Sequence, residues 1–105
     1  PILCGRTPEE IREILEKVNS PHLGFTFDVG HANITGNVHQ FLALKDEIVT
    51  VHLHDNSGDR DTHQALGEGT VPSDIYRTLG QKKSTIEVYT YADAVKSLQF
   101  LKKLT

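Results

Sequence analysis

The sequence predicts an α/β protein with a parallel sheet, because three short apolar segments alternate with amphipathic helical segments along the chain. The apolar segments cover residues 22–29, 48–53 and 85–89, with apolar residues at alternate positions or β-branched residues in a run. Single helices between consecutive strands imply right-handed crossovers, which make the strands parallel. The predicted architecture is three parallel strands alternating with four helices, in one domain over residues 1–105.

The first predicted helix begins at a capping box. Thr7 is followed by Pro8 at the first helical position, and Glu10 stands three residues after Thr7. Apolar side chains then recur at helical spacing, at Ile11, Ile14, Leu15 and Val18. Because Ser20 and Pro21 cannot continue this pattern, we expect the helix to end before them.

Three further helices are predicted over residues 38–45, 72–79 and 92–104. Gly80 suits the left-handed position just beyond the third helix. Asp93 in the first turn of the last helix and Lys102 and Lys103 in its last turn match the helix dipole. Each of these helices would follow a strand, and the first two would also lead into the next strand.

Composition favours a small polar ligand over nucleic acid or membrane. The formal net charge is −3, and the basic residues are scattered, so the basic surface of a dedicated nucleic-acid binder is not expected. No apolar run approaches the ~18 residues that span a bilayer. The single cysteine, Cys4, cannot form an internal disulfide, and a cytoplasmic setting is expected. Because the chain begins at Pro1 and has no methionine, we expect that a preceding segment was removed.

Each predicted strand carries one short pattern: threonine, an apolar residue, then a potential metal ligand. The three copies are Thr26-Phe27-Asp28, Thr50-Val51-His52 and Thr85-Ile86-Glu87. Side chains alternate across a strand, so threonine and ligand share one face, and the other face turns toward the helices. The residues expected on that helix-facing side are Phe25, Phe27, Val49, Val51, Leu53, Ile86 and Val88.

Asp28, His52 and Glu87 are therefore expected to converge at the C-terminal ends of the strands, where active groups of parallel α/β folds lie. Each also has an ordinary structural interpretation, as a turn aspartate, a hydrogen-bonded core histidine and a strand-end carboxylate. The shared face and shared sheet end favour a metal site. Oxygen and nitrogen ligands in this mixture suit zinc or manganese.

The loops after the first two strands supply a second candidate group. His31 lies three residues after Asp28, and Asp61 and His63 lie in the long polar loop after His52. A loop carrying Asp-x-His can bend to chelate an ion, although this spacing is common by chance. The remaining candidates are weaker: His54 and Asp55 as ligands, His22 and His39 as surface residues, and Gly67-Glu68-Gly69 as a turn that lets the backbone approach the site.

Three segments together resemble the sugar phosphate isomerase/epimerase and endonuclease IV superfamily, whose members have a xylose isomerase-like TIM barrel. The segments are Phe27-Asp28-Val29-Gly30-His31-Ala32, Val51-His52-Leu53-His54-Asp55-Asn56 and Asp61-Thr62-His63-Gln64-Ala65-Leu66-Gly67-Glu68-Gly69-Thr70. The resemblance covers nearly the whole chain and implies the C-terminal portion of a (β/α) barrel, after its fifth strand. It implies that the fifth-strand glutamate of the family, a metal ligand and acid/base, would precede Pro1.

Residue by residue, the resemblance implies two groups of metal ligands. Asp28, His52 and Glu87 match the strand ligands of the central metal. His31, Asp61 and His63 match the additional metal triad of the endonuclease branch.

The resemblance implies a metal-dependent isomerase or epimerase acting on a small sugar or sugar phosphate. The cofactor would be a divalent metal, zinc or manganese with magnesium as a further candidate, and Glu87 would serve as ligand and catalytic acid/base. Alone, the chain is expected to lack turnover because the partner glutamate is missing. Its open sheet edges are expected to favour self-association.

Two alternative functions remain. The first is an endonuclease IV-like zinc phosphodiesterase acting on abasic DNA, which the His31, Asp61 and His63 triad supports and the acidic charge opposes. The second is a non-catalytic half-barrel that assembles with another chain through its open edges.

Overall fold

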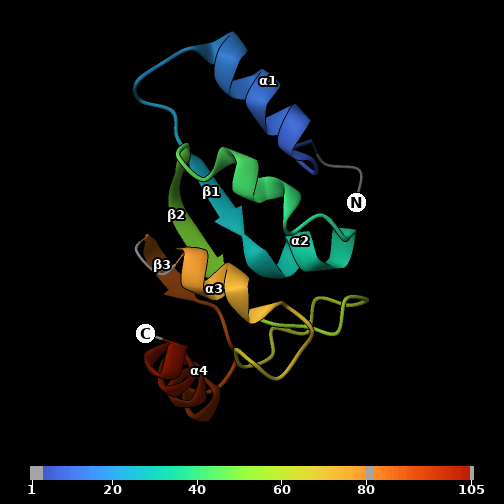
Figure 1. Cartoon of the computed structure of the whole chain (residues 1–105), viewed down its shortest axis with the longest axis vertical. Helices are drawn as coiled ribbons and strands as arrows, with labels where there is room; N and C mark the ends of the chain where they lie inside the picture. Colours follow the sequence, from blue (N-terminus) through green and yellow to red (C-terminus); the bar gives the residue numbers. More distant parts are fainter. Residues whose placement is uncertain (1–3, 80–81, 105) are drawn as a thin grey trace.

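The computed structural model describes residues 4–79 and 82–104, and it contains an open three-stranded sheet flanked by helices (Figure 1). The elements in chain order are α1 (Pro8–Val18), β1 (Phe25–Asp28), α2 (Val29–Thr35), the 3-10 helix η1 (Gln40–Leu44), β2 (Ile48–Leu53), α3 (Ser73–Leu79), β3 (Lys83–Ile86) and α4 (Tyr91–Leu104). The sheet order is β1-β2-β3, and both strand pairs are parallel. The predicted α/β class, with three parallel strands and four α-helices, is confirmed.

The capping box at the start of α1 is present in a modified form. The Thr7 hydroxyl accepts a hydrogen bond from the Glu10 amide at 3.2 Å. The Glu10 carboxylate reaches past Thr7 and accepts from the Gly5 amide at 3.0 Å. The Thr7 bond satisfies one of the amides that the first helical turn leaves without partners, so α1 begins where the sequence predicts.

The prediction of an α-helix over residues 38–45 is wrong, because the α-helix after β1 lies earlier in the chain and residues 40–44 form a 3-10 helix. The chain turns directly from β1 into α2, because the Asp28 carboxylate caps α2 by accepting a hydrogen bond from the His31 amide at 2.9 Å. Gly36 ends α2 in the left-handed conformation, with φ 75. Within residues 38–45 only η1 forms, and it buries Phe41 and Leu44.

Two of the predicted strands are displaced at their ends. β1 begins only at Phe25, and β3 spans Lys83–Ile86, so Glu87 follows that strand directly. The Glu87 amide nevertheless donates to the Leu53 carbonyl at 2.9 Å, which fixes Glu87 against β2. Gly80, expected to end α3, lies outside the described residues.

The hydrophobic core lies between the sheet and the helices η1 and α3. Phe27 and Val51 project from the sheet into this core and are almost completely buried. Val49 was expected on the same side but is 59% exposed. A register irregularity between Phe25 and Thr26 pairs Phe25 with Ile48, and Ile48 is buried in place of Val49.

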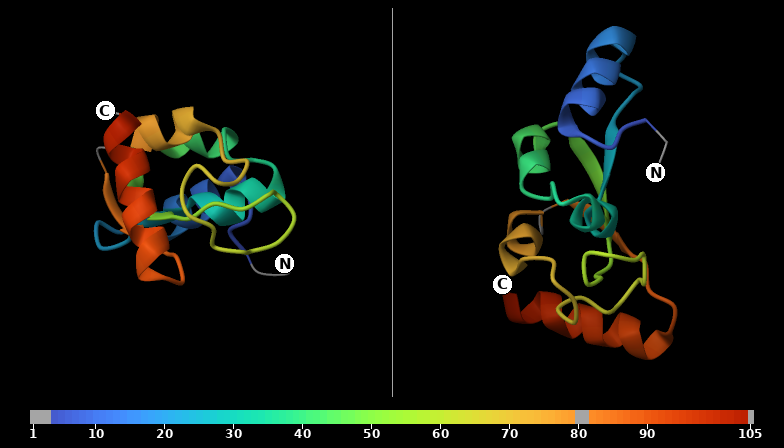
Figure 2. Two further views of the ribbon diagram at one scale, coloured as in Figure 1. Left: turned by 90° about the horizontal axis from the view of Figure 1, so that it is seen from below. Right: turned by 90° about the vertical axis from the view of Figure 1, so that its right-hand side faces the viewer.

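The other face of the sheet is polar. The Thr26 and Thr50 hydroxyls lie 2.8 Å apart across β1 and β2, as the shared strand pattern predicts. A long loop, residues 54–72, leaves the C-terminal end of β2 and lies between the sheet and α4 (Figure 2). The Leu66 amide of this loop donates to Ser97 of α4 at 3.1 Å.

Candidate metal centre

The strand cluster consists of Asp28, His52 and Glu87, which meet at the C-terminal end of the sheet. Asp28 is the last residue of β1 and pairs in register with His52 of β2. His52 Nδ1 lies 3.8 Å from Asp28 Oδ2 and 3.4 Å from Glu87 Oε1. One ligand atom from each residue falls within 4.8 Å of the others. The convergence on one face is therefore as predicted.

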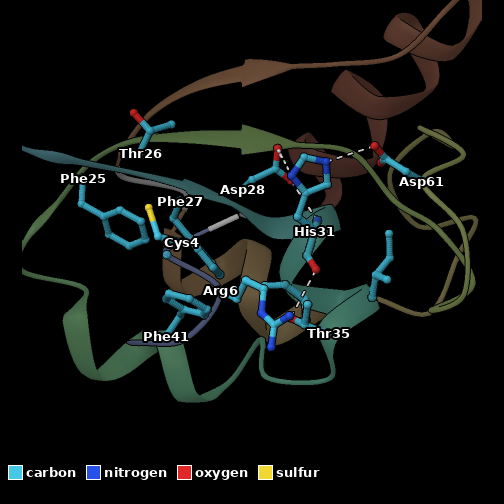
Figure 3. Close-up of a pocket in the computed structure, with 13 residues that line it drawn as sticks. Cys4, Arg6, Phe25, Thr26, Phe27, Asp28, His31, Thr35, Phe41 and Asp61 are labelled. Atoms are coloured by element: carbon cyan, nitrogen blue, oxygen red, sulfur yellow. Dashed lines mark hydrogen bonds and ion pairs between the residues drawn. The ribbon is translucent and has the colours of Figure 1, made fainter. Parts of the chain in front are cut away.

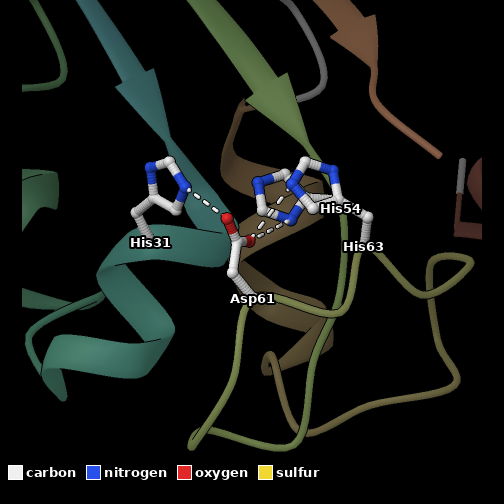
Figure 4. Close-up of side chains that lie close together, drawn as sticks. All are labelled: His31, His54, Asp61 and His63. Carbon is white, nitrogen blue, oxygen red and sulfur yellow. Dashed lines mark hydrogen bonds and ion pairs between the residues drawn. The ribbon is translucent and has the colours of Figure 1, made fainter.

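The loop cluster consists of His31, His54, Asp61 and His63 (Figure 4). It adjoins the strand cluster, because His54 Nε2 lies 2.8 Å from Asp28 Oδ1. His31 Nε2 lies 3.0 Å from Asp61 Oδ2, and His63 Nε2 lies 3.2 Å from Asp61 Oδ1. His31, Asp61 and His63 are brought together as the sequence predicts. His54 joins these three residues in the structure, although the sequence made it only a weak candidate for a metal ligand.

His54 lies directly after β2 and is completely buried. Its Nε2 lies 2.8 Å from Asp28 Oδ1, and its ring stacks on that of His63 with centroids 3.9 Å apart and planes at 4°. A Cβ on Gly30 would overlap the His54 ring, so the glycine makes room for it. His54 follows His52 by two residues, so an extended chain directs both side chains to the same face of the sheet. This spacing was the one signal in the sequence that could have identified His54 as a member of the cluster.

Gly30→Ala is expected to push His54 out of its position, because the new methyl group would overlap three ring atoms. Overpacking of this kind costs about 1–3 kcal/mol of unfolding free energy, and metal affinity should fall at both clusters. Zinc titration calorimetry together with thermal unfolding measures both effects. Gly24→Ala is the matched control, since its methyl group meets only the exposed Val49 side chain and metal affinity should be retained.

His63 links the two clusters through the backbone of Glu87. His63 Nδ1 donates to the Glu87 carbonyl at 2.8 Å, which fixes the ring and leaves Nε2 to bind a proton or a metal ion. His63 adopts φ 50, a conformation uncommon for residues other than glycine. The Tyr89 ring packs against it, with centroids 5.2 Å apart.

Electrostatics favour the charged forms of both aspartates. Partial burial acts to raise the pKa of Asp28, but hydrogen bonds from His54 and the His31 amide, and the nearby histidine charges, outweigh it and lower that pKa. At Asp61, burial likewise acts to raise the pKa, and the hydrogen bond from His31 and the surrounding histidines lower it overall. Each cluster thus contains a negatively charged carboxylate.

The pKa of His63 is raised. Burial acts to lower it, but the Glu87 carbonyl and the Asp61 carboxylate stabilise the protonated ring more strongly. His63 should therefore stabilise the metal-free fold fully below its unfolded pKa of about 6.5, and lose this contribution as the pH rises through its folded pKa.

The metal-free protein is accordingly expected to melt at a lower temperature at about pH 8 than at about pH 6. Asp28 and Asp61 contribute equally to stability at both pH values. Their lowered pKa stabilises the fold above the unfolded pKa, and this contribution is lost only in acid, as the pH falls through the folded pKa. Thermal unfolding in chelator measures the difference. His63→Gln should abolish it, whereas His39→Gln, at an exposed histidine, should not; a flat wild-type profile would refute the assignment.

The loop that carries Asp61 and His63 is held by Asp55, which is completely buried. Its carboxylate accepts hydrogen bonds from the amides of Asn56 at 2.9 Å, Gly67 at 3.0 Å and Val71 at 3.1 Å. The sequence makes Asp55 only a weak candidate for a metal ligand, and its carboxylate oxygens face the amides of its own loop instead. Its role in the structure is to fold that loop.

The glycine turn serves this same packing. A Cβ on Gly69 would overlap the Asn56 carbonyl and the Asp55 carboxylate. Gly67 has φ 89 and lies against Phe100 of α4. The turn does allow a close backbone approach, but at Gly69 the approach is to Asp55 and Asn56, which belong to neither cluster. His22 and His39 are exposed, as expected for surface residues.

A cavity of about 380 Å³ opens beside the two clusters (Figure 3). Asp28, His31 and Asp61 border it, and the aromatic rings of Phe25 and Phe41 line its apolar part. Its volume is in the range of small-molecule sites.

Within the described part of the chain, every helix is too short or too polar to cross a membrane.

Comparison with known proteins identifies related chains. A family model described as "Xylose isomerase-like TIM barrel" matches residues 1–104. "Uncharacterized protein MJ1311" of Methanocaldococcus jannaschii is 38% identical over 96% of this chain and 38% of its own length. "Probable endonuclease 4" of Mycoplasmopsis pulmonis is 30% identical over 64% of this chain and 29% of its own length.

Two solved structures superpose on the chain. The crystal structure of a D-tagatose 3-epimerase-like protein matches with a TM-score of 0.83 and 38% identity, over 97% of this chain and 42% of that one. The TTHB071 protein from Thermus thermophilus, soaked with ZnCl2, matches with a TM-score of 0.82 and 33% identity, over 95% of this chain and 41% of that one. The chain thus spans about two fifths of the length of these relatives.

Proposed function

The chain belongs to the xylose isomerase-like TIM barrel family, and we propose that it forms the metal-binding part of a sugar or sugar-phosphate isomerase or epimerase. The match over residues 1–104 confirms the resemblance seen in the sequence. The matched proteins include an epimerase-like and an endonuclease 4 relative. The family membership is a finding, and isomerisation or epimerisation of a sugar or sugar phosphate is the reaction that we propose.

The observation that carries the proposal is the convergence of Asp28, His52 and Glu87 on the polar face of the sheet. Two carboxylates and one imidazole form a donor set that fits a divalent ion, with zinc or manganese preferred and magnesium a further candidate. Asp28 Oδ1 already accepts from His54 and from the His31 amide, so Oδ2 is the oxygen left for the ion.

The chemistry proposed for these residues is proton transfer next to a carbonyl group. A bound divalent ion supplies Lewis-acid polarisation of that carbonyl. Asp28 and His52 would hold the ion, and the cavity that Asp28 borders would receive the substrate. Glu87 takes the proton from the carbon next to the carbonyl and returns it to a neighbouring atom, for which a carboxylate at the sheet end is suited.

The test is solvent proton exchange, measured on the complete barrel that contains these residues. In deuterated water, a panel of ketoses and ketose phosphates should acquire deuterium next to the carbonyl only when Mn²⁺ or Zn²⁺ is present. Glu87→Gln should remove exchange, and Glu47→Gln, at an exposed glutamate, should leave it unchanged. The proposal fails if no substrate of the panel exchanges with metal present. The 105 residues alone are expected to bind metal without turnover.

A second candidate function is cleavage of abasic DNA by a zinc phosphodiesterase. The assembled loop cluster favours it, together with the similarity to the Mycoplasmopsis "Probable endonuclease 4". The net charge of −3 disfavours it, because phosphate-backbone binding is driven by basic side chains. Zinc-dependent nicking of a duplex with one abasic site, without sugar proton exchange, would establish this second function instead.

A further inference from the structure

The backbone pairing of β1 with β2 ends at Asp28 and His52, because α2 follows β1 directly. Two side chains continue the connection beyond that point. His54 Nε2 lies 2.8 Å from Asp28 Oδ1, and two residues further along the chain Asn56 Nδ2 donates to the Gly30 carbonyl at 2.9 Å. Both side chains are completely buried. Asn56 thus ties the first turn of α2 to the segment that follows β2.

The orientation of the Asn56 amide is fixed by the groups around it. Its Oδ1 accepts from the Gly58 amide at 2.9 Å, and a backbone amide only donates. Asn33 Nδ2 donates to the same oxygen at 2.8 Å. The Asn56 nitrogen therefore faces the Gly30 carbonyl, which only accepts. Because the position is completely buried, turning the amide over would leave these groups without partners.

The turn that contains Gly30 lies beside both donors of Asp28 Oδ1. One donor is the amide of His31, the next residue in the chain, at 2.9 Å. The other is His54, whose ring occupies the space left by the missing side chain of Gly30. A carboxylate oxygen only accepts, so His54 Nε2 carries the hydrogen of this bond. A movement of the turn would therefore disturb both bonds and free the Asp28 carboxylate to rotate.

We propose that Asn56 is a positioning residue of the strand cluster, which keeps Asp28 Oδ2 directed at the divalent ion. The inference rests on the proposed metal-dependent function and adds a residue that belongs to neither cluster. Asn56 holds the turn at Gly30. That turn and the His54 ring hold Asp28 Oδ1, so Oδ2 stays toward His52, at 3.8 Å from the His52 Nδ1.

Two substitutions of Asn56, made in the complete barrel, remove the bond to Gly30 in different ways. Asn56→Asp keeps an acceptor for Asn33 and for the Gly58 amide, but an ionised carboxylate has no hydrogen for the Gly30 carbonyl. Asn56→Ser shortens the side chain without adding charge, so it serves if the buried carboxylate prevents folding. Asn33→Ala is the matched control, because it removes the bonds to Asn56 Oδ1 and to Thr70 but leaves the bond between Asn56 and Gly30.

Calorimetric titration with Mn²⁺ measures the effect on the ion. Loss of a group that orients a metal ligand typically weakens metal binding by about 10- to 100-fold, and Asn56 acts through one further contact. Both Asn56 variants should therefore bind Mn²⁺ roughly 10-fold more weakly than wild type, whereas Asn33→Ala should bind as wild type does. A merely structural role would weaken binding in step with the stability that each variant loses in urea. An equal loss of affinity in Asn33→Ala, or unchanged affinity in the Asn56 variants, would overturn the assignment.

Proton NMR of the metal-free barrel tests the same contact without an ion. The hydrogen on His54 Nε2, held by Asp28, should give a resolved downfield signal in wild type and in Asn33→Ala. In the Asn56 variants this signal should shift or be lost through exchange with water, and an unchanged signal would contradict the role of Asn56. If wild type binds no Mn²⁺, the proposed function fails, and the signal still decides whether Asn56 holds Asp28.

Discussion

Asp28→Asn is expected to weaken metal binding more than any other single substitution in the chain. Asp28 contacts both clusters: Oδ1 accepts from His54, and Oδ2 lies 3.3 Å from His31 Nδ1 and 3.8 Å from His52 Nδ1. The amide removes one negative charge and replaces one acceptor by a donor. Affinity at the strand cluster should fall by at least about 100-fold, by analogy with losses seen when a supporting group alone is removed.

The same substitution should leave the fold almost unchanged. Asparagine caps a helix as well as aspartate does, so α2 should still begin after its cap at residue 28. Calorimetric titration with Zn²⁺ and Mn²⁺, alongside circular dichroism, separates the two effects. Asp59→Asn, at an exposed aspartate of the long loop, is the control and should bind as wild type does. An affinity of Asp28→Asn close to that of wild type would show that Asp28 is not a ligand.

Asp55→Ala is expected to have the largest effect on stability. Three loop amides, of Asn56, Gly67 and Val71, would lose their common acceptor at a fully buried position. Each buried group left unsatisfied costs about 1–3 kcal/mol, so the free energy of unfolding should fall by roughly 3–5 kcal/mol after partial relaxation. This is a large share of the about 5–15 kcal/mol that is typical of a domain.

Urea denaturation of the metal-free protein measures this loss. The control is Asp59→Ala, in the same loop, where the carboxylate accepts from the exposed Arg60 amide and the change should stay within about 0.5 kcal/mol. If Asp55→Ala were as stable as Asp59→Ala, the loop would be held by contacts other than this carboxylate.

The strand pattern was readable from the sequence because it depends on local alternation. Thr26 and Asp28 share a face, as do Thr50 and His52, since side-chain direction in a strand follows from position alone. The parallel arrangement then brings the strand ends together without further information. The strand cluster could therefore be predicted before any contact was known.

The position of α2 and the role of His54 could not be read in this way. The segment from Val29 to Thr35 is short and has no sustained apolar period, and its start depends on Asp28 acting as both cap and candidate ligand. The burial of His54 requires the missing side chain of Gly30, which only the folded sheet brings against it. The structural role of Asp55 could not be predicted for the same reason, because the amides that donate to its carboxylate are brought together only by the folded loop.

Asp28, His52 and Glu87 are proposed to hold a divalent ion at the C-terminal end of the sheet, and anomalous diffraction tests this most directly. Crystals grown with Mn²⁺ or Zn²⁺ would be measured on both sides of the absorption edge of the metal. We expect an anomalous peak within bonding distance, about 2.0–2.2 Å, of Asp28 Oδ2, His52 and Glu87. Peaks confined to surface groups such as His39 and Asp74, with none among the three strand residues, would contradict the proposal.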